Sequence, residues 1–64
     1  MVHNTLHNLM VQHTVESNAL WKIQNHYLED SGDNAEVKSF WEKLAKDKED
    51  HIAEITELLK KELG

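Results

Sequence analysis

Apolar residues recur every three or four positions along two long stretches of the chain, which are separated by one short polar segment. This spacing places the recurring side chains on one face of an α-helix, and neither stretch keeps the period of two that a β-strand requires. In the first stretch, the recurring positions are Val2, Leu6, Leu9, His13, Glu16, Leu20, Ile23 and Tyr27. In the second stretch, they are Val37, Phe40, Trp41, Leu44, Lys48, His51, Ile52, Ile55, Leu58 and Leu59.

The polar segment between the stretches reads Asp-Ser-Gly-Asp over residues 30–33, and it is the one strong turn signal in the sequence. The chain has no proline, and neither of its two glycines falls inside an apolar stretch. We therefore expect helices over about 5–29 and 35–63. Gly32 suits a left-handed conformation, and Asp33 suits the N-cap of the second helix. The expected fold is all-α: a single domain formed by an antiparallel two-helix hairpin.

Four polar residues interrupt the apolar stripes: His13 and Glu16 in the first, Lys48 and His51 in the second. Residues equally distant from the turn face each other in an antiparallel hairpin. His13 and His51 are equally distant from residue 32, and so are Glu16 and Lys48. The sequence thus predicts a polar layer of two imidazoles and an acid–amine pair in an apolar interior. Buried polar groups cost free energy unless they have partners, so we interpret the layer either as a binding site or as a structural cluster.

The first interpretation is a metal site. Imidazole and carboxylate groups bind iron and zinc, and His13 and Glu16 have the i, i+3 spacing that presents both from one helix face. With His51 opposite, the candidate ligands are Glu16, His51 and His13. The second interpretation needs no metal, because the ammonium of Lys48 neutralises Glu16 and the pair fixes the register of the helices. A protonated amine cannot bind a metal ion, so Lys48 favours this second interpretation.

Residues 40–52 resemble the second helix of the ferritin-like superfamily, and of rubrerythrins in particular. There an aromatic residue and Leu-Ala precede an acid-rich turn that ends in Glu-x-x-His. Glu16 and Tyr27 resemble the inward glutamate and the later aromatic residue of the first helix. The resemblance implies half of a ferritin-like four-helix bundle, with Glu16 and His51 as metal ligands. The sequence departs from the family at Lys48, which stands where the bridging glutamate is expected.

Apolar side chains also flank both stripes, and two helices cannot cover all of them. We therefore expect two chains to form an antiparallel four-helix bundle. The residues expected to pack in this homodimer are Trp21, Trp41, Ile52 and Leu59.

Composition excludes several classes of protein. The chain has no cysteine, so it can form neither a disulfide nor a thiolate metal site. Its net charge is −5 and its seven basic residues are all lysine, which argues against nucleic-acid and membrane partners. We expect a cytoplasmic protein with one of two functions. It is either a small ferritin-like protein that binds iron or zinc at the His/Glu layer, or a metal-free homo-oligomeric interaction module. Only the first would be an enzyme, a metal-dependent oxidoreductase that oxidises ferrous iron, for example.

Overall fold

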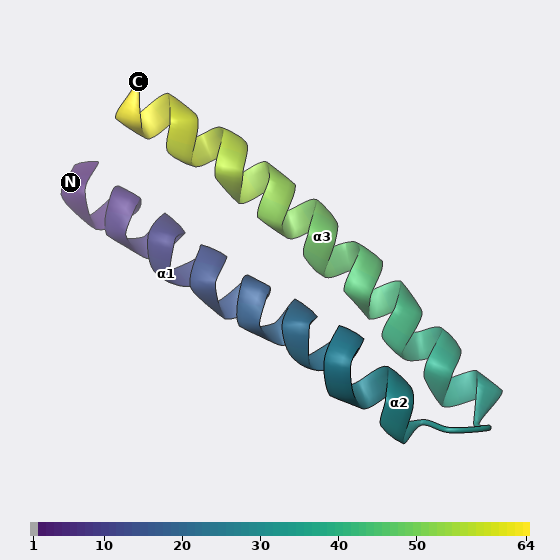
Figure 1. Ribbon diagram of the computed structural model, residues 1–64. Coiled ribbons are helices and arrows are strands. Elements are labelled where there is room, and N and C mark those ends of the chain that lie inside the picture. Colours follow the sequence, from purple (N-terminus) through teal and green to yellow (C-terminus); the bar gives the residue numbers. More distant parts are fainter. Residues whose placement is uncertain (1) are drawn as a thin grey trace.

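The computed structural model describes residues 2–64, with side chains from residue 4 onward, so the side chain of Val2 lies outside the described residues. Two long helical arms lie side by side and run in opposite directions, with both termini at the same end (Figure 1). Residues 2–64 contain no β-strand. The predicted helical hairpin is confirmed.

The first arm consists of three consecutive helical segments: α1 (Val2–Lys22), η1 (Ile23–Tyr27) and α2 (Leu28–Asp30). In η1 the helix is a π-helix, and the backbone N–H of Leu28 bonds to the carbonyl of Ile23, five residues earlier. A π-turn inserts one extra residue into the helix and thereby rotates everything that follows. Leu28 consequently takes the inward position that the sequence predicted for Tyr27, which is 37% exposed. Tyr27 is thus more exposed than the sequence predicted, although its ring still contacts Trp41 of the second arm.

The turn between the arms begins at Ser31, whose hydroxyl donates to the carbonyl of Leu28. Gly32 has a φ of +53°, the left-handed conformation expected for it. The side chain of Asn34, and not that of Asp33, caps the second arm by accepting a hydrogen bond from the backbone N–H of Val37 at 3.1 Å. Asn34 takes this role because its backbone is extended and immediately precedes the first helical residue.

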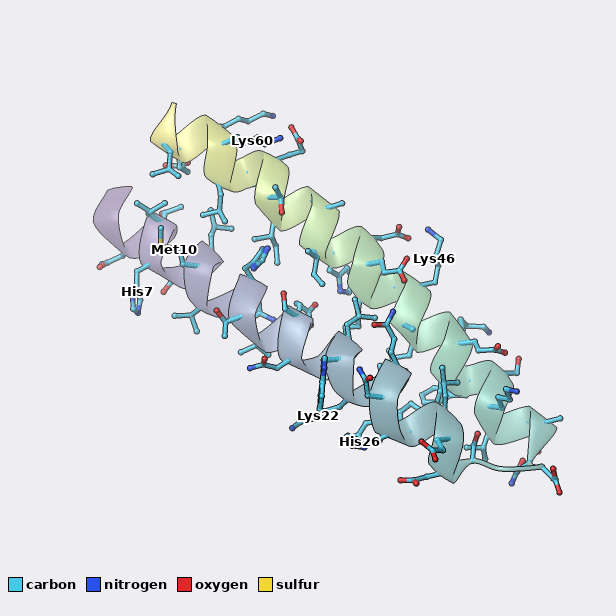
Figure 2. The ribbon with its side chains drawn as sticks, viewed as in Figure 1. His7, Met10, Lys22, His26, Lys46 and Lys60 are labelled. Carbon is cyan, nitrogen blue, oxygen red and sulfur yellow. The ribbon has the colours of Figure 1, made fainter. Side chains whose placement is uncertain are left out.

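The second arm is one continuous helix, α3 (Ala35–Leu63). An acidic residue in its first turn, Glu36, and two lysines in its last turn complement the helix dipole. Lys46 and Lys60 extend away from the first arm, as Figure 2 shows. No helix within residues 2–64 has the length and the apolar character that crossing a membrane requires.

The two arms share a small contact area, because each helix buries only a narrow strip of its surface. Ile23 and Ala45 are the only hydrophobic side chains of the described chain that are buried, and the other inward apolar residues are partly exposed. Several residues of the predicted stripes lie at the edge of the contact and not within it. The large hydrophobic residues that remain exposed are Met10, Val11, Val15, Trp21, Tyr27, Val37, Phe40, Leu58 and Leu63. The inward position predicted for Val37, Phe40 and Leu58 is therefore wrong.

Candidate functional site

Glu16 is the one buried charged residue of the described chain, with 5% of its surface exposed. It lies near the middle of α1, among the apolar residues that face α3. The helical spacing of three and four residues sets this orientation, because any residue at that position of the stripe points toward the second arm. A carboxylate in such a place requires partners from the facing helix.

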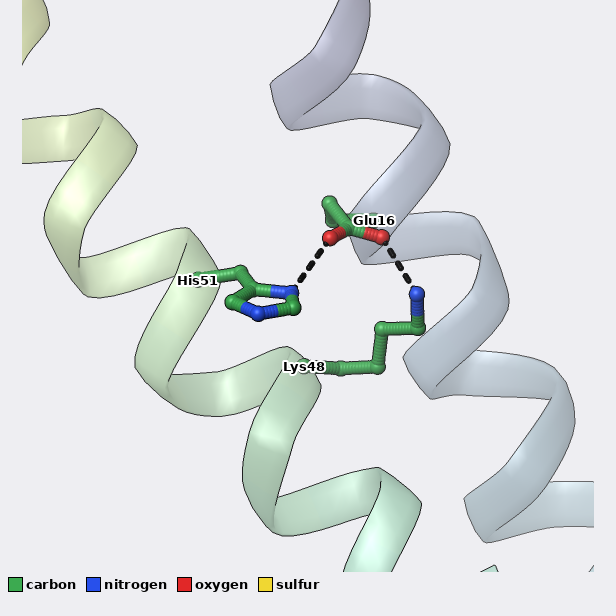
Figure 3. A network of polar contacts seen from close by, with 3 residues as sticks. All are labelled: Glu16, Lys48 and His51. Atoms are coloured by element: carbon green, nitrogen blue, oxygen red, sulfur yellow. Dashed lines mark hydrogen bonds and ion pairs between the residues drawn. The ribbon is translucent and has the colours of Figure 1, made fainter.

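Lys48 and His51 of α3 supply these partners (Figure 3). They lie three residues apart on the helix and thus approach Glu16 from one face of α3. The Lys48 ammonium donates to Glu16 Oε2 at 2.8 Å, and His51 Nδ1 lies 2.7 Å from Glu16 Oε1. A carboxylate only accepts hydrogen bonds, so His51 Nδ1 carries the proton. Each oxygen of the carboxylate is thus matched to one donor.

The three residues differ in their access to water. The Lys48 side chain is 22% exposed and the His51 side chain is 52% exposed, whereas that of Glu16 is 7% exposed. The hydrogen bond from Lys48, the largest contribution, and the bond from His51 hold the pKa of the Glu16 carboxyl below its ordinary value, although burial acts in the opposite direction. Glu16 therefore remains a carboxylate at neutral pH. Its charge is balanced by the Lys48 ammonium.

His13 does not join this cluster. It is partly buried on α1, one turn before Glu16, but it forms no hydrogen bond or ion pair with another described residue. Within the described chain, no group of three or more histidine, aspartate or glutamate side chains is placed to hold a metal ion. The structure thus brings together Glu16, Lys48 and His51 of the predicted polar layer, and it gives no support to an iron or zinc site formed by Glu16, His51 and His13.

His51 also departs from the sequence prediction of a fully buried imidazole. Its Nδ1 is directed at Glu16 (Figure 3), but 52% of its side chain is exposed. The described surface contains no pocket beside it. This arrangement holds the imidazole in one orientation and stabilises a buried charge, but it encloses no volume in which a small substrate would be bound.

The residues predicted to pack in a dimer have different surroundings. Trp21 is exposed and lies edge-on to His26, with ring centroids 5.0 Å apart. Trp41 contacts both Tyr27 and Phe40, with centroids at 4.8 and 5.2 Å. The sequence placed Tyr27 and Trp41 on the two inward stripes, but it did not predict the contact between their rings.

Ile52 and Leu59, the other two residues predicted to pack in the dimer, are partly buried on α3. Comparison of the chain with protein-family models, with curated proteins and with solved structures gives no match. The ferritin-like assignment consequently stays an expectation from the residues quoted above.

Proposed function

We propose that this chain is a metal-free homo-oligomeric interaction module, in which two hairpins associate into a four-helix bundle. The observation that carries the proposal is the 2.8 Å contact between Lys48 Nζ and Glu16 Oε2. In a ferritin-like site, a carboxylate would stand at Lys48 and a metal ion would balance the acidic ligands. Here the ammonium itself balances Glu16, which removes the electrostatic reason for binding a cation.

The cluster serves to define how the two helices align. A buried ion pair adds little net stability, but losing one partner leaves a buried charge uncompensated. If α3 slipped by one helical turn along α1, Glu16 would lose the hydrogen bonds from Lys48 and His51. The cluster therefore disfavours other registers, much as single buried polar residues do in coiled coils.

The exposed apolar side chains support association. A chain of 64 residues buries a small fraction of its surface, and small scaffolds without disulfides or metals commonly gain stability by oligomerising. This hairpin has only two buried hydrophobic residues in its described part, yet it exposes nine large ones. A second copy would cover part of such a surface and enlarge the apolar core.

Metal content and mass measured on one sample test the proposal. The protein is purified without an affinity tag and analysed by sedimentation equilibrium and by elemental analysis. We expect a dimer without stoichiometric metal, and a melting temperature that does not change on adding Zn²⁺ or Fe²⁺. Stoichiometric metal that is lost in both Glu16→Ala and His51→Ala would instead establish the iron or zinc site. A monomer at all concentrations would refute the homo-oligomeric module.

A further inference from the structure

One flank of α3 carries a regular row of exposed residues. The row occupies positions spaced by three and four residues, so it forms one stripe along the helix beside the face that contacts α1. All eight residues are exposed. We call this row the α3 stripe; it consists of Glu36, Phe40, Lys43, Asp47, His51, Glu54, Leu58 and Lys61.

The α3 stripe is complementary to its own reverse. Four pairs of stripe residues are arranged symmetrically about the middle of the helix, two about residue 49 and two about the point midway between residues 48 and 49. Each pair joins opposite charges, an acid and an imidazole, or two apolar groups. Two copies of α3 laid antiparallel and centred at residue 49 would place the members of each pair opposite each other. The pairs are Glu36 with Lys61, Phe40 with Leu58, Lys43 with Glu54, and Asp47 with His51.

Among the described residues, no ion pair within the chain involves Glu36, Lys43, Asp47, Glu54 or Lys61 of the stripe, whereas His51 pairs with Glu16. The described ion pairs of α3 are Lys46 with Asp50, Lys60 with Glu57, Lys48 with Glu16 and His51 with Glu16. His51 uses only Nδ1 within the chain, and its half-exposed ring can donate to a carboxylate of another molecule only as the imidazolium, in which Nε2 also carries a proton. The charges of Glu36, Lys43, Asp47, Glu54 and Lys61 are thus left for contacts between chains.

The opposite flank of α3 lacks this property. In the same antiparallel arrangement, Lys38 would face Lys60 of the second copy, and Glu49 would face itself. Facing like charges oppose association. Charge complementarity therefore distinguishes the two flanks and selects the α3 stripe.

We infer that a second copy of this chain binds along the α3 stripe, with the two α3 helices antiparallel and the two-fold axis at residue 49; this rests on the proposed function and specifies its interface. The stripe lies about a third of a turn from the face that contacts α1. The same helix can therefore contact α1 on one face and a second copy on the other, as helices of a four-helix bundle do. Val15 lies one residue before the inward residue Glu16 on α1, and Asp47 lies one residue before the inward residue Lys48 on α3. Because the two helices are antiparallel, Val15 and Asp47 lie on the same side of the hairpin. Exposed Val15 thus adds apolar contact near the axis.

The size of this face suits a stable dimer. The hairpin measures 47 × 14 × 14 Å between Cα atoms. One long face therefore offers roughly 650 Å² per chain, or roughly 1,300 Å² in total, which falls in the range of specific protein interfaces. Exposed Trp21, which was expected from the sequence to pack in the dimer, lies outside this interface.

A charge exchange tests the inference. Lys43 and Glu54 are eleven residues apart on one helix, about 16 Å, so they cannot pair within a chain. Lys43→Glu and Glu54→Lys each place like charges opposite each other twice in the dimer. We expect each to raise the dimer dissociation constant on the order of tenfold at low salt. The double variant restores opposite charges, so its dissociation constant returns to the wild-type value.

Lys38→Glu is the matched control, because it makes the same charge change on the opposite flank and leaves the dimer unaffected. Circular dichroism verifies that every variant keeps the helical content of the wild type. A wild-type dimer that the single variants do not weaken, or that the double variant does not restore, overturns this interface and leaves the proposed homo-oligomer intact. A wild-type monomer throughout the concentration range overturns both.

Discussion

Replacing Lys48 by methionine probes the buried charge directly. The substitution removes the ammonium beside Glu16 Oε2 and keeps most of the side-chain volume. The Glu16 side chain, 7% exposed, would retain its charge with only the His51 donor as a partner. Removing one member of a fully buried ion pair costs about 3–5 kcal/mol. Lys48 is 22% exposed, so water reaches this side of the carboxylate, and we expect a loss of about 2 kcal/mol in the free energy of unfolding.

A loss of this size lowers the melting temperature of so small a domain by about 8–16 °C. Urea and thermal unfolding followed by circular dichroism would measure it, at one fixed protein concentration because association raises the apparent stability. The double variant Glu16→Leu/Lys48→Met should regain most of the loss, since no buried charge remains. A Lys48→Met protein as stable as the wild type, or a double variant less stable than Lys48→Met, would refute the reasoning.

Three further predictions concern pH and the turn. The pKa of Glu16 is held below its ordinary value of 4.5. Its contribution to stability is therefore complete above that pH and is lost as the pH falls through the folded-state pKa. Urea titrations from about pH 6 to pH 3 should show a larger loss in the free energy of unfolding for the wild type than for Glu16→Gln. Gly32→Ala should cost about 1 kcal/mol, and Gly32→Asn less, because φ is +53° and no neighbouring atom obstructs a Cβ. Equal stability of the alanine variant and the wild type would contradict that assignment. Asn34→Ala should cost about 1 kcal/mol by removing the N-cap, whereas Asn34→Asp should be neutral, as chemical denaturation would test.

Which residues of the two helices lie opposite each other could be predicted from the sequence, because this register depends only on each residue's distance from the turn. Glu16 and Lys48 are equally distant from Gly32, and the structure places their side chains in contact. The same reasoning placed His13 opposite His51, yet His51 bonds to Glu16. An imidazole at the margin of a helix contact reaches whichever acceptor its side-chain torsions allow. A buried carboxylate is a stronger acceptor than a neutral ring.

The sequence by itself determined the two helices, the turn at Gly32 and the presence of charged groups in an apolar stripe, because periodicity and turn chemistry are local properties. Only the tertiary structure decided which side chains lie inside. The π-helix at Ile23–Tyr27 rotates the end of the first arm so that Leu28 replaces Tyr27, and nothing in the apolar spacing indicates this extra residue. The rotation of each helix about its own axis likewise decides that Glu16 is enclosed while His51 remains half exposed. A period of 3.6 residues leaves that rotation free, and the packing of one helix against the other fixes it.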